Sequence, residues 1–134
     1  MKRSIFMKKT FLTIMSFLTV MILAACGGSS IDGATAEKYV DHAEEVVVLL
    51  NKGNFDEVYA MFNEVMQEEL PISDLEAITP IINEAGEYEG IDRAAVEERD
   101  DHFLVFLQAE YSENNLTFSV TYNQEDEIAG LYVQ

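Results

Sequence analysis

Two carboxylates adjoin an imidazole at one place in this chain, Asp100-Asp101-His102. Carboxylates and imidazoles are the ligands of many metal sites, but adjacent residues on a strand or turn point in different directions and seldom converge on one ion. The spaced ligands of a calcium loop are missing, also at the acidic stretch 125–127, and so are the paired histidines of a zinc helix. We therefore expect neither a metal site nor a bound cofactor.

Two strand residues are the candidates to line a cavity. Tyr122 ends the predicted strand 116–122 on its buried face, where the hydroxyl would enter a cavity or reach water at the rim. Glu110 lies in the predicted strand 103–111, and an inward carboxylate there could act as a general base. Its alternative is a strand-end residue in water. Because no phosphate-binding loop, nucleophile elbow or basic-aromatic patch accompanies these residues, we assign no catalytic residue.

Cys26 is the only cysteine, and the residues before it follow the pattern of a secretory signal. A basic pair at 8–9 is followed by an apolar run over 11–25 that ends in small residues. A run of about 15 residues is short for a bilayer-spanning helix, which needs about 20. We therefore predict that residues 1–25 are a signal peptide.

The stretch Leu23-Ala24-Ala25-Cys26 resembles the lipobox of bacterial lipoproteins. The resemblance implies that diacylglycerol is attached to the Cys26 thiol and that the signal is cleaved directly before this residue. The mature protein would then carry palmitate and be anchored by lipid on the extracytoplasmic face of the cell membrane. Two acyl chains, at about 0.8 kcal/mol per buried methylene, anchor a protein stably. The alternative is an incidental cysteine at the end of a transmembrane anchor.

After the signal, residues 26–33 form the lipidated cysteine and a flexible tether rich in glycine and serine. Residues 34–134 have the length of a single domain with a modest core. The start of the chain is Met1 or Met7, since Met7 carries its own basic pair and the whole apolar run.

The mature chain is strongly acidic. Without the signal, four basic residues stand against 25 acidic residues, a net charge of −21. Such a charge repels phosphate backbones, so we exclude nucleic acid as a partner. It could attract cations and basic partners or hold the domain off an anionic membrane, and a solvated acidic surface that aids solubility is the alternative.

Apolar residues at helical spacing predict helices in the first half of the domain. One stripe covers 35–52, and Gly53 suits the left-handed capping position after it. Asn54 then caps a second stripe over 55–66, with Glu57 in capping-box register.

A third helix is predicted to open at Ser73-Asp74-Leu75-Glu76, a second capping-box pattern, and to end at Gly86. Pro80 lies inside it. We favour a helix that kinks there; the alternative is a short turn that ends at Thr79, with Pro80 opening a new helix.

Four strands follow, over 91–99, 103–111, 116–122 and 128–133. Short loops join them, so we expect an antiparallel sheet. Helices first and a meander second predict an α+β domain, in which the helices cover one face of a curved sheet of about four strands.

The domain also resembles the domain of unknown function 3887 family, whose members occur in lipoproteins of Gram-positive bacteria and in some chains precede an α/β-hydrolase. The resemblance covers about 49–133 and rests on short motifs, with Pro80 as a departure. These are Gly53-Asn54-Phe55-Asp56, Ser73-Asp74-Leu75, Gly86, Leu116-Thr117-Phe118-Ser119-Val120-Thr121-Tyr122 and Ile128-Ala129-Gly130-Leu131. It implies a nuclear transport factor two-like, cystatin-like cone, and no site residue.

We expect a non-catalytic binding or protein-interaction module at the membrane. The alternatives are an enzyme or hydrolase accessory that binds a small molecule in the cone, and a cation-responsive acidic surface protein. The strand 103–111 begins with residues that are apolar on both faces, while one helical layer covers only one face of a sheet. We therefore also expect pairing of two copies through the sheet.

Overall fold

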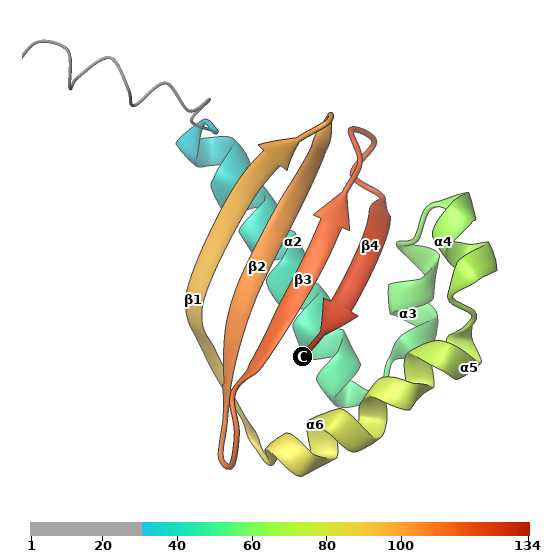
Figure 1. The fold of residues 1–134 in the computed structure, drawn as a ribbon, viewed down its shortest axis with the longest axis vertical. Coiled ribbons are helices and arrows are strands. Elements are labelled where there is room, and N and C mark those ends of the chain that lie inside the picture. The colour runs from blue at the N-terminus through green and yellow to red at the C-terminus, as the bar shows by residue number, and fades with distance from the viewer. Residues whose placement is uncertain (1–30) are drawn as a thin grey trace, which may run out of the picture. The chain divides into compact units, whose positions relative to one another are not determined.

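A computed structural model describes residues 31–134; Cys26, the lipobox and the predicted signal lie outside the described residues. The domain begins with helices and ends with strands (Figure 1). The helices are α2 (Gly33–Lys52), α3 (Phe55–Ala60), α4 (Glu64–Glu69), α5 (Ile72–Leu75), the 3-10 helix η2 (Glu76–Ile78) and α6 (Thr79–Ala85). The strands are β1 (Tyr88–Arg99), β2 (His102–Tyr111), β3 (Leu116–Tyr122) and β4 (Ile128–Val133).

The four strands form one antiparallel sheet in the order β1-β2-β3-β4. Figure 1 shows α2 crossing behind the curved sheet, while the face toward the viewer carries no helix of the described part. The predicted α+β fold is confirmed. Among residues 31–134, no helix has both the length and the apolar character needed to cross a membrane.

The core lies between α2 and the inner face of the sheet, which is the face toward α2. Every second residue of β3, and of β2 from Val105 onward, is buried there, as strand geometry requires. On α2 the buried residues recur at helical spacing: Tyr39, Ala43, Val46, Val47, Leu49 and Leu50. Every fully buried side chain of the described part is hydrophobic, so the charges of the domain lie at its surface.

The predicted second helix is broken in the structure. It ends at Ala60 because the chain leaves the helix to bridge the edge of the sheet: Phe62 pairs with Ile128, the Ile128 N–H donates to Met61 O at 2.8 Å, and the Asn63 N–H donates to Ile128 O at 2.9 Å. A new helix, α4, then starts under an Asn63 cap. Asn54 precedes α3 but makes no side-chain capping bond, so the capping box predicted there was wrong.

The third predicted helix also differs from the favoured form. Pro71, and not Ser73, precedes α5, and the 3-10 helix η2 separates α5 from α6. Pro80 lies in the first turn of α6, where its missing N–H breaks no helical hydrogen bond. The two-segment alternative therefore describes the chain better than one kinked helix, although α6 begins one residue earlier, at Thr79.

A substitution at Gly86 tests the packing of the junction between α6 and β1. The φ angle of Gly86 is 97°, and a Cβ at this position would collide with the Ser112 side chain, whose hydroxyl accepts a hydrogen bond from the Glu87 N–H at 2.8 Å. Gly86→Ala is therefore expected to lower the free energy of unfolding by about 1–3 kcal/mol in urea denaturation. Gly33→Ala, in open space at the start of α2, is the matched control and should cost less than about 0.5 kcal/mol. Equal effects of the two substitutions would contradict this packing.

Candidate functional site

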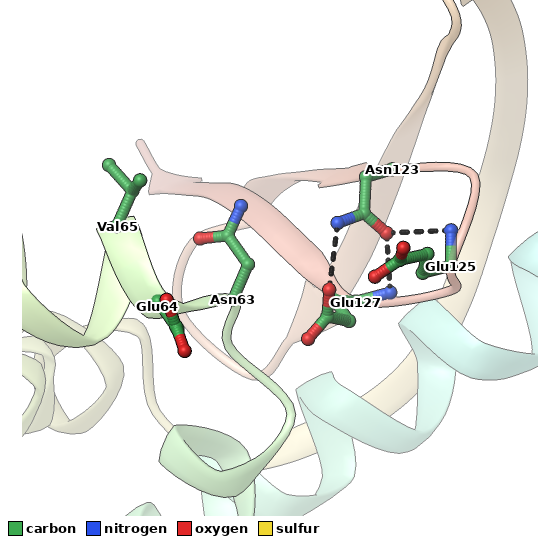
Figure 2. A pocket seen from close by; sticks show the side chains of 6 residues that line it. All are labelled: Asn63, Glu64, Val65, Asn123, Glu125 and Glu127. Carbon is green, nitrogen blue, oxygen red and sulfur yellow. Dashed lines mark hydrogen bonds between the residues drawn. The ribbon is translucent and has the colours of Figure 1, made fainter.

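The surface carries an open depression between the start of α4 and the β3–β4 turn, with a volume of about 350 Å³ (Figure 2). We call it the acidic depression. Its lining residues are Asn63, Glu64, Val65, Asn123, Glu125 and Glu127. The bridge between Phe62 and Ile128 brings these two segments together, since it fixes Asn63 beside the first residue of β4.

The side chains of the two asparagines of the acidic depression are engaged in hydrogen bonds that stabilise the fold. Asn63 Oδ1 accepts the Met66 N–H at 2.9 Å and so caps α4. Asn123 Oδ1 accepts the N–H groups of Glu125 and Glu127, both at 2.9 Å, and its Nδ2 donates to Glu127 Oε1 at 3.1 Å. Figure 2 shows these bonds closing the turn. The amides thus hold the walls in place. The carboxylates of Glu64 and Glu125 and the second oxygen of Glu127 remain to meet a ligand.

Three glutamates and no basic residue line the acidic depression. Their combined negative charge favours a cation or the basic side chain of a partner. A dedicated metal site is a different matter, because within residues 31–134 no three His, Cys, Asp or Glu side chains are grouped closely enough to hold an ion. The arrangement therefore suits a Lys or Arg side chain better than a coordinated metal.

Tyr122 lies in an aromatic cluster between α2 and the end of the sheet. The ring of Tyr39 stacks on Phe103 with centroids 4.3 Å apart and is 5.3 Å from the ring of Tyr122, while His42 is 6.1 Å from Tyr122. Tyr122 is 2 % exposed, and its hydroxyl has no hydrogen-bond partner among the described residues. Burial raises the pKa of this hydroxyl, with Glu45 and Asp126 adding to the effect.

Asp126 ties the β3–β4 turn to α2. Its carboxylate accepts hydrogen bonds from Lys38 Nζ and Tyr39 Oη, both at 2.7 Å, and its backbone φ is 62°. The bonds from Lys38 and then Tyr39 lower the pKa of Asp126, whereas burial and the bond to Asp126 raise the pKa of Tyr39 to about 12. Because the Lys38–Asp126 pair is largely exposed, it stabilises the fold by less than about 1 kcal/mol.

The two cavity candidates from the sequence lie on opposite faces of the sheet. Tyr122 points into the core, while Glu110 is exposed on β2 between the buried Ala109 and Tyr111. Since side chains alternate along a strand, Glu110 faces away from the inner face that holds Tyr122. The two groups are therefore not placed to act on one ligand.

Asp100-Asp101-His102 forms the tight turn between β1 and β2. The φ angles of Asp100 and Asp101 are 51° and 62°, values that aspartate tolerates in turns. His102 Nδ1 lies 2.8 Å from Asp100 O, so the imidazole takes part in the turn itself.

The family model of a protein of unknown function, DUF3887, matches residues 43–131. The chain belongs to this family. The match runs from the middle of α2 to β4 and includes every lining residue of the acidic depression. It agrees with the resemblance found in the sequence over about the same range. A search of curated proteins found no match to this member of the DUF3887 family.

The acidic depression was missed from the sequence because residues 63–65 were assigned to the interior of one long helix. Asn63-Glu64 does carry a local signal, since asparagine is a preferred cap and an acidic residue suits the first turn of a helix. Its proximity to 123–127 depends on the bridge to β4, which no local pattern indicates.

Two tyrosine substitutions test the aromatic cluster. Tyr122→Phe removes a buried hydroxyl without a partner and should raise the free energy of unfolding by about 1 kcal/mol. Tyr39→Phe removes the bond to Asp126 and should lower it by about 0.5–1.5 kcal/mol. Urea denaturation at neutral pH measures both, and destabilisation by Tyr122→Phe would show that the hydroxyl has a partner after all.

The raised tyrosine pKa values also predict sensitivity to alkali. The pKa of a tyrosine in the unfolded chain is about 10. In the fold, the pKa of Tyr39 is about 12, and the pKa of Tyr122 is raised as well. The unfolded state therefore releases these protons first, so the free energy of unfolding should be intact below about pH 10 and fall as the pH rises toward 12. Urea midpoints across this range measure the loss. An unchanged loss in Tyr122→Phe would contradict the contribution of that residue.

Proposed function

We propose that this member of the DUF3887 family is a lipid-anchored extracytoplasmic protein that works as a non-catalytic interaction module. The observation that carries the proposal is Leu23-Ala24-Ala25-Cys26, which follows a basic pair and an apolar run and contains the only cysteine of the chain. Diacylglycerol on Cys26 would hold the protein in the membrane through two acyl chains.

The position of the domain in the chain supports this proposal. Helix α2 starts at Gly33, seven residues after Cys26. A segment of this length spans at most about 25 Å when fully extended, so the domain would work close to the membrane surface. The lipobox resemblance implies the extracytoplasmic face of a bacterial cell membrane, and the family resemblance implies a Gram-positive bacterium.

The surface of the domain supports interaction as its role. The inner face of the sheet is filled by side chains with no exposed area, among them Leu107, Phe118 and Val120. The features that a ligand can reach are therefore on the surface of the domain. Among them, the acidic depression with its three glutamates is suited to a basic side chain of a partner protein. The description of the fold as a nuclear transport factor two-like cone belongs to the same proposal.

The two other functions have weaker support. A small-molecule enzyme or hydrolase accessory would need polar groups that converge in the cone. Among the described residues, the hydroxyls of the buried Tyr39 and Tyr111 are bonded to Asp126 and Asn51, which leaves the hydroxyl of Tyr122 as the one buried side-chain group without a hydrogen-bond partner. A cation-responsive protein has the charge of the acidic depression in its favour. Calcium titration by calorimetry would favour that function if binding were tight and survived added salt, because binding to exposed carboxylates is screened by salt.

Palmitate labelling tests the anchor. Cells that produce the full chain should incorporate labelled palmitate into it, and Cys26→Ser should abolish both the label and retention in the membrane fraction. Ala25→Gly keeps a small residue before the cysteine and serves as the control that retains the label. A wild-type protein that carries a free Cys26 thiol and its first 25 residues would overturn the proposal.

A further inference from the structure

The outer face of the sheet, opposite α2, carries two neighbouring rows of side chains without a carboxylate. Figure 1 shows this face toward the viewer. Strand pairing places Ala95, Phe106, Ser119 and Tyr132 side by side in one row, the aromatic row, and Arg93, Gln108, Thr117 and Gln134 in the next, the amide row. The rows on either side contain the carboxylates of Glu97 and Glu110. In a mature chain with a net charge of −21, these two rows suit a neutral ligand, whereas a polyanion would be repelled by the rest of the surface.

The aromatic row presents two rings at a fixed spacing. Phe106 lies on β2 and Tyr132 on β4, with the small side chain of Ser119 on β3 between them. Two strand spacings, roughly 10 Å, therefore separate the two aromatic residues. Phe106 is half-buried, and Tyr132 is 75 % exposed. The row thus offers two apolar ring surfaces to a ligand that crosses the strands.

From this spacing we propose that the outer face binds a glycan strand of the bacterial cell wall, a β-1,4-linked chain of N-acetylated sugars. Alternate sugars of such a chain present the same ring face, and the length of two sugars is close to two strand spacings. The strand would run across the sheet, with one sugar stacked on Phe106 and the next but one on Tyr132. An extended peptide repeats every 7 Å or so on one side, roughly, and does not match the two rings.

The amide row supplies hydrogen bonds to the same ligand. Gln108 and Gln134 carry planar amides and Thr117 carries a hydroxyl, groups that both donate and accept as sugar hydroxyls do. Residues two positions apart on a strand place this row about 7 Å from the aromatic row, on the same face. A sugar stacked on Phe106 would therefore turn one ring edge toward Gln108 and Thr117.

A recess beside Phe106 favours an N-acetylated sugar. Its lining residues are Arg93, Ala94, Ala95, Phe106, Gln108 and Thr117, and its volume is about 320 Å³. The methyl group of an acetamido substituent would pack on Ala95, while its carbonyl oxygen would accept a hydrogen bond from Arg93. The Arg93 side chain is 81 % exposed, and its Nε lies 3.5 Å from Asp92 Oδ2. Because a guanidinium has several N–H donors, this contact leaves donors for the ligand.

The glycan site adds a partner to the interaction module proposed above and uses a surface other than the acidic depression. Access to the cell wall depends on the proposed extracytoplasmic location, whereas binding of a soluble oligosaccharide depends on the outer face alone. The two proposals can therefore fail independently.

Saturation-transfer NMR with the full-length protein in a sugar-free detergent tests the site. The probe is chitohexaose, a soluble β-1,4-linked hexamer of N-acetylglucosamine, whose acetamido methyl groups should receive saturation. Cellohexaose has the same linkage without acetamido groups and should bind at least about fivefold more weakly, as expected for the loss of a hydrogen bond. Maltohexaose, with α-1,4 linkages, curves and should not bind, because its sugars do not match the spacing of the two rings.

Variants at two exposed positions separate stacking from hydrogen bonding. Tyr132→Ala should weaken chitohexaose binding at least about fivefold, as for truncation of an aromatic anchor, and Tyr132→Phe, which keeps the ring, should stay within about twofold of the wild type. Arg93→Ala should reduce the preference for chitohexaose over cellohexaose to less than about twofold. Since both side chains are largely exposed, neither substitution should unfold the domain.

Two controls complete the experiment. Val65→Ala, at an exposed position of α4 outside the two rows, should bind chitohexaose as the wild type does. Cys26→Ser removes the proposed lipid and should also bind equally, which keeps this result separate from the palmitate test. No saturation of chitohexaose, equal binding of cellohexaose or maltohexaose, or an unchanged affinity in Tyr132→Ala would overturn the proposed glycan site.

Discussion

The packing of α2 across one face of the sheet is the contact on which the rest of this domain depends. Alternate residues of β2 and β3 form one apolar face of the sheet, which must be covered. Helix α2 covers it with its own apolar stripe, which includes Ala43, Val46 and Val47. Because the buried side chains of the described domain are all hydrophobic, the charge of an extremely acidic chain is confined to its surface. This separation leaves the inner face of the sheet as a hydrophobic core.

A one-sided core also decides where ligands and partners can bind. Two recesses of the described surface lie outside the core, one between α4 and the β3–β4 turn and one on the outer face of the sheet. Their chemistry differs: the first is lined by three carboxylates, while the second joins an aromatic ring, small side chains and Arg93.

The turn between β3 and β4 links these features because it belongs to both the fold and the site. Asp126 fastens the turn to α2 through Lys38 and Tyr39, residues almost ninety positions earlier in the chain. Asn123 closes the same turn and thereby presents Glu125 and Glu127 to the acidic depression. Asp126 has a left-handed backbone conformation within this turn, and its carboxylate accepts the hydrogen bonds from Lys38 and Tyr39 of α2. The shape of the acidic depression is therefore coupled to the packing of α2.

The sequence by itself determined the α+β class, the four strands to within three residues, the end of α2 at Gly53 and the family, since these follow from periodicity, turn chemistry and local motifs. Only the tertiary structure decided the break after Ala60, the segmented course around Pro80 and the acidic depression. Each of these arises where residues distant in the chain meet: the edge of β4 takes the hydrogen bonds of 61–63 that a longer helix would have used. Periodicity reports which face of an element is buried, but a sheet edge competes for backbone hydrogen bonds through contacts that no local pattern contains.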